Sequence, residues 1–282
     1  MRLLRLRDTE IRHTDRVYRY SRWHAVLIVI VVLGGAAWAA FHAYATGWKV
    51  GYYIAAATVL FSQLMRRFVT ARFRPSNWLA RTNDEGVFIQ FRSYLNYHLP
   101  PDDLTVVFLS YGEIRSARLI KERVTVPDPQ NRRDATQYLR YVELELAGDV
   151  APLVAALNAE AGEHAPTEKR WYGSSSTLYQ DHPMHMESDP FFRIRWQATP
   201  GAHAFLEALR PYTTIADPVS ITQDFAHLEG LSRQEQQARL RELARRGETM
   251  SAIYLARKLH GGSLAEAKDM VEQLSNKTGA GS

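Results

Sequence analysis

One uninterrupted apolar segment constrains this sequence more than any other feature. Residues 23–48 contain no Asp, Glu, Lys or Arg, and every residue from Ala25 to Phe41 is apolar. At 1.5 Å per residue, about 20 such residues in a helix cross the roughly 30 Å hydrocarbon core of a bilayer. The segment predicts a transmembrane helix over about 23–45. A signal peptide followed by a buried core helix is the alternative, but the charged leader of 22 residues is too long for the n-region of a signal peptide.

A second uncharged run follows after Lys49. It covers residues 50–65, ends at Arg66, and becomes long enough to span only as a helix over about 48–67 that includes interfacial aromatic residues. Residues 45–47 leave room for one tight turn. The two runs therefore predict a transmembrane helical hairpin of about 23–68. Small residues at four-residue spacing, which let helices approach closely in lipid, are Gly35 and Ala39, Ala36 and Ala40, and Gly51 and Ala55.

Basic residues flank the hairpin on one side only. Residues 1–22 form a basic leader with seven Arg against three acidic residues, four more Arg follow the second run, and the turn has only Lys49. The positive-inside rule places both termini in the cytoplasm. The orienting residues are Arg16, Arg19, Arg22, Arg66, Arg67, Arg72 and Arg74. The Arg- and Ala-rich composition without cysteine is typical of bacteria, so we expect a multi-pass protein of the bacterial inner membrane, in contact with membrane lipid.

The charge balance bears on possible partners. The 282 residues carry a formal net charge of +5, and the sequence pI is about 9.4. The positive excess lies beside the hairpin, because residues 75–282 hold 23 basic against 27 acidic residues. An acidic cytoplasmic portion is a poor binder of the phosphate backbone, so we expect no nucleic-acid partner. The absence of cysteine excludes disulfides, thiolate metal sites and a cysteine nucleophile.

Alternating polar and apolar residues after the hairpin predict a mostly antiparallel β-domain, and hence an α+β membrane protein. The expected strands are 87–92, 105–109, 114–126, 138–146 and 192–196, and the expected helices are 151–161 and 200–209. The order of elements, with a helix closing the domain after the last strand, resembles the pleckstrin-homology-like domains of bacterial membrane proteins. That resemblance covers residues 76–215, with the helix at 151–161 as an insertion.

The C-terminal part is predicted to be helical. After a linker at 216–231, capping boxes at Ser232/Glu235 and Ser263/Glu266 predict a tail over 232–276, with residues 277–282 as a disordered end. The expected helices are 233–246, 249–260 and 264–275. The motif L-x-E-A-K-D-x-V-E, which begins at Leu264, resembles the C-terminal domain of the ribosomal stalk protein.

That resemblance implies a protein-binding helix pair. Arg257 and Lys268 stand at positions where the family has basic residues that bind translation GTPases, and Glu266 lies between them. Thr249, Tyr254 and Ala265 replace family lysines, and the flanking strands of the family's fold are missing. We therefore expect Arg257, Lys268 and Glu266 to contact a protein partner that the sequence does not identify.

Residues of metal-ligand type lie close together at His182, His185, Glu187 and Asp189. Pro183 and the loop-like composition of 173–189 argue against the helical spacing of a zinc protease, so a solvated loop is the expected state. The serines at 174–176 lack a G-x-S-x-G elbow, and no phosphate-binding glycine loop occurs. No catalytic residue or cofactor is therefore predicted.

The sequence as a whole favours a non-enzymatic, membrane-anchored interaction or scaffold protein. A membrane-bound hydrolase or metalloenzyme that uses the His182/His185 loop is one alternative. Another is a β-domain that senses anionic lipids, for which basic residues on one predicted strand are the candidates. These residues are Arg115, Arg118, Lys121 and Arg123.

Overall fold

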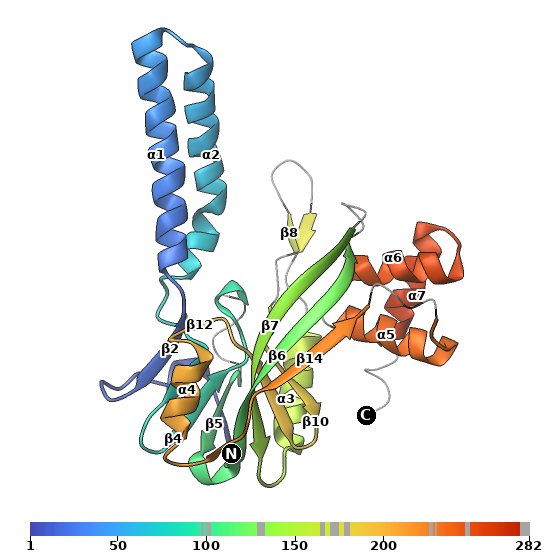
Figure 1. Cartoon of the computed structure of the whole chain (residues 1–282). Helices are drawn as coiled ribbons and strands as arrows, with labels where there is room; N and C mark the ends of the chain where they lie inside the picture. The colour runs from blue at the N-terminus through green and yellow to red at the C-terminus, as the bar shows by residue number, and fades with distance from the viewer. Residues whose placement is uncertain are drawn as a thin grey trace. The chain divides into compact units, whose positions relative to one another are not determined.

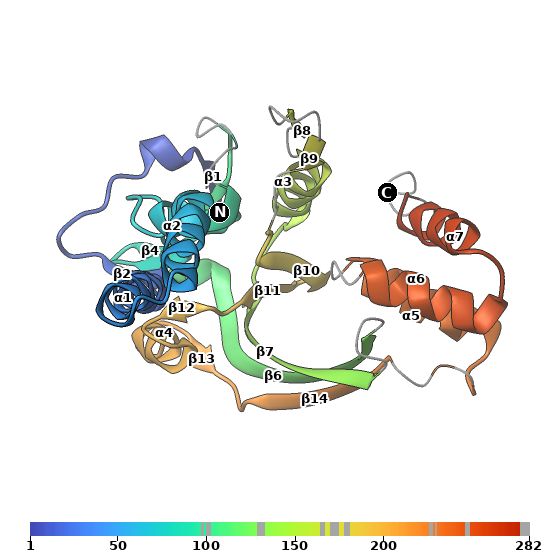
Figure 2. The same cartoon turned by 90° about the horizontal axis from the view of Figure 1, so that it is seen from above.

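A computed structural model describes the chain except for residues 97, 98, 100–102, 129–132, 164–166, 170–174, 178–180, 226, 227, 229, 246–248 and 277–282. The chain divides into two compact units (Figures 1 and 2). Unit 1 comprises Met1–Leu119 and Tyr141–Asp217, and unit 2 comprises Ile120–Arg140 and Pro218–Ser282. Each unit is therefore built from two separate stretches of sequence. The predicted disordered end at 277–282 lies outside the described residues.

Two long antiparallel helices of unit 1, α1 (Trp23–Thr46) and α2 (Val50–Ala71), lie side by side in both views. Gly47 ends α1 with a φ of 69°, a conformation that favours glycine. Within the described residues, one helix is long and apolar enough to cross a membrane, over Ala25–Thr46. The apolar part of α2 among these described residues is shorter, Val50–Gln63. The hairpin itself agrees with the predicted hairpin, whereas only its first arm has the length and composition of a membrane span.

The N-terminal leader, predicted only as a basic flank, forms part of the first sheet of unit 1. This sheet has the order β1-β5-β4-β3-β2-β12, with antiparallel neighbours. Its strands are β1 (Arg2–Leu4), β2 (Arg16–Tyr20), β3 (Ala80–Thr82), β4 (Gly86–Gln90), β5 (Val106–Ser110) and β12 (Ala198–Thr199). In β2, Tyr18 and Tyr20 are buried while Arg16 and Arg19 are not. Buried and exposed residues therefore alternate along β2, as in a strand with one buried face, although its arginines make this alternation hard to see in the sequence.

A second sheet has the order β10-β11-β7-β6-β13, with β14 also pairing β6. Its strands are β6 (Ile114–Asp128), β7 (Arg133–Leu146), β10 (Met184–Ser188), β11 (Phe191–Arg195), β13 (Thr214–Ile215) and β14 (Val219–Asp224). Residues 114–119 of β6 and 141–146 of β7 belong to unit 1, and the rest of both strands belongs to unit 2. A separate pair, β8 (Thr167–Lys169) and β9 (Ser175–Thr177), completes the strands.

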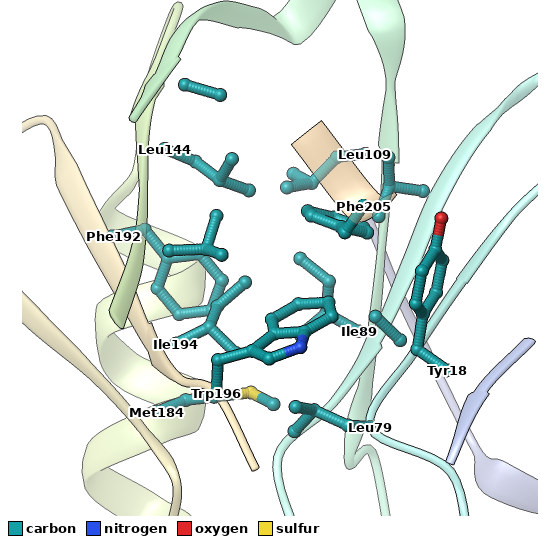
Figure 3. Close-up of a cluster of buried hydrophobic side chains, with 14 of the residues drawn as sticks. Tyr18, Leu79, Ile89, Leu109, Leu144, Met184, Phe192, Ile194, Trp196 and Phe205 are labelled. Atoms are coloured by element: carbon teal, nitrogen blue, oxygen red, sulfur yellow. The ribbon is translucent and has the colours of Figure 1, made fainter. Parts of the chain in front are cut away.

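The main core of unit 1 lies between its two sheets (Figure 3). Leu144, Phe192 and Ile194 project from one sheet toward Ile89 and Leu109 of the other. Helix α4 (Ala202–Leu209) closes this core with Phe205, whose ring packs edge-on against Tyr18 at 5.1 Å. Helix α3 (Ala151–Gly162) adds Leu153. Short 3₁₀ turns are η1 (Leu6–Asp8), η2 (Tyr94–Asn96) and η3 (Tyr111–Glu113).

Unit 2 combines a three-stranded sheet segment with three helices, α5 (Arg233–Arg245), α6 (Thr249–His260) and α7 (Leu264–Asn276). Its core joins Val124 and Val126 of β6 to Phe225 and to apolar residues of all three helices. Strand β14 runs parallel to β6 from Val219 opposite Ile120 to Asp224 opposite Thr125. The segment predicted as a linker therefore contains a strand and belongs to the same core as the tail.

Candidate functional site

The outer surface of the hairpin is the first candidate, because its large apolar side chains point outward. Trp38, Phe41 and Leu60 are 66%, 70% and 67% exposed. The buried positions of α1 and α2 that the structure describes are small instead: Ala25, Ala36, Ala39, Ala43, Gly51 and Ala71. A helix pair of a soluble protein buries its large apolar residues, whereas helices in lipid contact each other through small ones.

The closest approach of the arms lies near the turn. A Cβ added at Gly51 would be 2.8 Å from the Ala39 carbonyl oxygen and 2.8 Å from the Ala43 Cβ. A Cβ at Gly35 would meet nothing within 4 Å. Of the predicted small-residue pairs, Gly51 and Ala39 therefore lie at the contact and Gly35 does not. The arms meet there because Gly51 lacks a side chain.

A polar network at the base of the hairpin connects α2 to the β-domain. Arg72, the residue after α2, donates from Nη1 to the Ser21 carbonyl at 2.9 Å and from Nη2 to the Tyr94 hydroxyl at 2.7 Å. Its guanidinium also lies 4.6 Å from the centre of the Tyr94 ring. Arg72 was predicted to orient the hairpin through its charge, and the structure adds that it fastens the hairpin to its own domain.

The network continues through buried groups around Tyr20. Asn77 Nδ2 donates to the Tyr20 carbonyl at 3.2 Å. Asn96 and Asp181 bond reciprocally, at 3.1 Å and 2.8 Å, and Asp181 forms an ion pair with Arg195. Burial, and then the charge of Asp181, raises the pKa of the Tyr20 hydroxyl well above its usual value. Tyr20 therefore stays neutral, and its ring packs against Tyr94 at 5.0 Å.

A second buried cluster is centred on Arg92. Its Nε and Nη2 bond the Glu160 carboxylate at 2.6 Å and 2.9 Å, and Nη2 also reaches Asp103 at 2.6 Å and Glu163 at 2.9 Å. The His182 ring lies beside this cluster, with Nδ1 3.8 Å from Glu160. Removing one partner of a buried ion pair such as this one strongly destabilises the fold, because the other charge is left buried and unpaired. This cluster could not be predicted from the sequence, because Arg92 and Glu160 are 68 positions apart.

The predicted metal-ligand residues lie in two different places. Residues 184–188 form strand β10 and are not a loop, which puts His185 and Glu187 on that strand with Nε2 and Oε2 3.6 Å apart. Arg193 neutralises Glu187 at 2.8 Å. His182 lies instead at Glu160, and burial lowers its pKa. Within the described part of the chain, no group of three or more His, Cys, Asp or Glu is arranged to hold a metal ion.

The basic residues proposed to meet anionic lipid divide between the units. In unit 1, Arg115 pairs with Glu145 at 3.0 Å and Arg118 Nε bonds Glu143 at 2.6 Å. Hydrogen bonding from Ser116, at 2.7 Å, and the charge of Arg115 lower the pKa of Glu145. These pairs offset the positive charge of that part of β6. Lys121 and Arg123 are exposed in unit 2.

Arg81 holds the N-terminal loop, a role that no local sequence pattern predicts. Its side chain is 1% exposed, donates from Nη1 to the Glu10 carbonyl at 2.8 Å and lies 3.3 Å from Asp15. Its guanidinium is 4.8 Å from the Trp78 ring and 4.5 Å from the Phe88 ring. The leader is thereby joined to the sheet by a buried cation between two aromatic rings.

The helical tail presents the three predicted partner-binding residues in different roles. Glu266 Oε2 accepts a hydrogen bond from the Ser263 amide at 2.8 Å, as the capping box predicts, so it stabilises the start of α7. Lys268 is exposed and lies 3.6 Å from Glu272. Arg257 is exposed on α6 at helical spacing from Met250 and Tyr254, which are 65% and 40% exposed. These last three residues form what we call the α6 stripe.

Comparison with known proteins gives no indication of function. No protein-family model, curated protein or solved structure matches this chain. The outward apolar surface of the hairpin, the network at its base and the α6 stripe are therefore the features from which a function is argued.

Proposed function

We propose that this chain is a non-enzymatic interaction protein anchored in the bacterial inner membrane, with both arms of the hairpin in the bilayer and both termini in the cytoplasm. The observation that carries the proposal is the outward placement of large apolar side chains on α1 and α2. Residues 23–71 contain no Asp or Glu, and the basic residues lie at the base of the hairpin apart from Lys49 near its turn. Lipid is the solvent that such a surface fits.

The β-domain in this proposal is the rigid body that the anchor holds at the membrane. Arg72 ties the end of α2 to Tyr94, and Asn77 ties the next segment to the end of β2. The two facing sheets and the closing helix α4 fit the pleckstrin-homology-like resemblance. A rigid attachment keeps the domain beside the bilayer, where a membrane complex can meet it.

Single-cysteine labelling tests the topology cleanly because the chain has no native cysteine. Thr46→Cys places a thiol at the turn, and Gly112→Cys places one in the β-domain, where an added Cβ meets nothing within 4 Å. In spheroplasts, a membrane-impermeant maleimide is expected to label Thr46→Cys, and to label Gly112→Cys only after lysis. Equal labelling of both thiols, or release of the chain by alkaline carbonate, would contradict the proposal.

The tail in this proposal binds a protein partner through the α6 stripe. Met250 and Tyr254 offer apolar surface and Arg257 offers a cation, a combination enriched at interface centres. This mixed surface fits a partner that presents an apolar pocket beside an acidic group. It also agrees with the stalk-protein resemblance, since Arg257 is one of the positions matched there.

Affinity purification from membranes tests this surface with point variants of the full chain, so that no folded part is removed. Met250→Ser together with Arg257→Glu changes only exposed groups, and Arg233→Glu at the start of α5 is the matched exposed control. The stripe variant is expected to lose a partner that both wild type and the control retain. Identical partner sets for all three chains would remove the proposed role of the tail.

A further inference from the structure

The apolar surfaces of the two arms of the hairpin extend to different distances from the turn. The span of α1, Ala25–Thr46, has 22 residues and reaches about 33 Å, whereas the uncharged part of α2, from Val50 to Met65, reaches only about 24 Å. Both arms start from the same turn. Toward the base of the hairpin, α1 is therefore still apolar where α2 already carries Arg66.

A groove of 180 Å³ lies between the arms at this level. Ile28, Val32 and Leu33 line it from α1, and Phe61, Arg66 and Val69 line it from α2. The hydroxyls that also face it are occupied, because Ser62 bonds the Val59 carbonyl at 2.7 Å and Thr70 bonds the Arg66 carbonyl at 2.9 Å. Among the lining residues that the structure describes, the remaining polar side-chain groups are the Gln63 amide and the Arg66 guanidinium, so the groove is mainly apolar.

Arg66 has no counter-ion within the hairpin. Residues 23–71 contain no Asp or Glu, and none of the described ion pairs includes Arg66. A second copy of the hairpin could not supply a carboxylate either, since it has the same sequence. A cation at membrane depth is costly unless it meets an anion, and a guanidinium matches a phosphate group with two parallel hydrogen bonds.

We infer that this groove binds a phospholipid with an anionic headgroup. One acyl chain lies along the apolar surface of Ile28 and Val32, and the phosphate pairs with Arg66. This inference rests on the proposed membrane anchoring. The lipid would cover the apolar base of α1, where the apolar part of α2 has already ended, and it would neutralise Arg66, the one cation among the described residues that line the groove.

Lipid selectivity of the full chain tests the site. The chain is reconstituted in vesicles of four parts phosphatidylcholine to one part phosphatidylglycerol, with a spin-labelled acyl chain on either lipid. We expect labelled phosphatidylglycerol to be immobilised about five-fold more strongly than labelled phosphatidylcholine, the factor that one basic residue near the surface typically contributes. Arg66→Gln should bring this ratio close to one, and Val32→Trp should lower it by filling the groove without changing charge.

Lys49→Gln is the matched control, because it removes one exposed positive charge at the other end of the hairpin. Selectivity that falls equally in Lys49→Gln and Arg66→Gln would overturn the site in favour of diffuse attraction. Displacement of the labelled lipid by inorganic phosphate at constant ionic strength would assign the site to free phosphate. Carbonate extraction is run first on every variant. Release from the vesicles would contradict the membrane anchor itself, whereas retention without selectivity would overturn only the lipid site.

Discussion

At the residue scale, loss of the Arg81 side chain should destabilise the fold strongly. Arg81→Met removes the hydrogen bond to Glu10 and leaves the Asp15 carboxylate, 2% exposed, without its cation. Breaking a buried pair in this way typically costs about 3–5 kcal/mol. The exposed pair of Arg12 with Glu85, whose side chains are 63% and 49% exposed, is the control, and Arg12→Gln should leave the urea midpoint nearly unchanged because solvent screens an exposed pair. Urea unfolding of the full chain in detergent measures both, and equal losses would contradict the role of Arg81.

His182 makes the stability of unit 1 depend on pH. Burial lowers its pKa from the ordinary value of 6.5, and Glu160, Asp181 and Arg92 are the charged groups around it. Below pH 6.5 the unfolded chain binds a proton there more readily than the folded chain, so stability must fall as the pH drops. Wild type should therefore lose thermal stability between pH 7 and pH 5.5 more steeply than His182→Phe. His185→Phe, at an exposed position of β10, should keep the wild-type slope, and parallel slopes for all three chains would exclude the effect.

At the element scale, the hairpin depends on one glycine. A methyl group at Gly51 would overlap the Ala39 carbonyl oxygen, which is backbone and cannot turn away. Gly51→Ala should therefore lower the stability of the helix pair by about 1–3 kcal/mol despite the higher helix propensity of alanine. Gly35→Ala adds the same methyl group into open space and should be neutral or slightly stabilising. Thermal loss of helicity in detergent compares the two, and a Gly51→Ala chain as stable as wild type would show that the arms adjust.

Local signals explain why helices were predicted well. The capping boxes at Ser232 and Ser263 form with the predicted Glu235 and Glu266 contacts, and α5, α6 and α7 begin and end within one residue of their predicted bounds. Strand β2 was missed because its arginines hide a two-residue alternation. Strand β14 was missed because it pairs in parallel with β6, which lies far earlier in the chain, so no hairpin turn connects the two strands.

The candidate sites were less predictable than the elements, because they depend on pairs far apart in the sequence. Arg92 finds Glu160 and Arg72 finds Tyr94 only after the sheets and the hairpin have formed. Conversely, His182 and His185 are three positions apart and still contact different partners, because β10 begins between them. Closeness in sequence is therefore a weak guide to a shared site outside a helix.

At the scale of the whole molecule, the two units are interleaved in sequence. Residues 120–140 leave unit 1 in the middle of β6, complete part of unit 2 and return in β7. The sequence predicted a tail that is added after a finished β-domain. In the structure, the tail shares a core with Val124 and Val126, which are contributed from the middle of the chain. Shifts in composition could not reveal this arrangement. They mark where the sequence changes from one composition to another, but they do not show that residues 120–140 pack with the tail.

This interleaving predicts how a truncated chain behaves. A chain that ends at Asp217 loses β14, which pairs with β6 over six residues, and the helices that cover Val124 and Val126. The exposed strand edge and apolar face should then cause self-association and binding of a hydrophobic dye. A chain that ends at Asn276 keeps all of α7 and is the matched control. Size-exclusion chromatography in detergent separates the outcomes: an autonomous tail would leave the Asp217 truncation as monodisperse as the control, whereas a shared core requires it to aggregate.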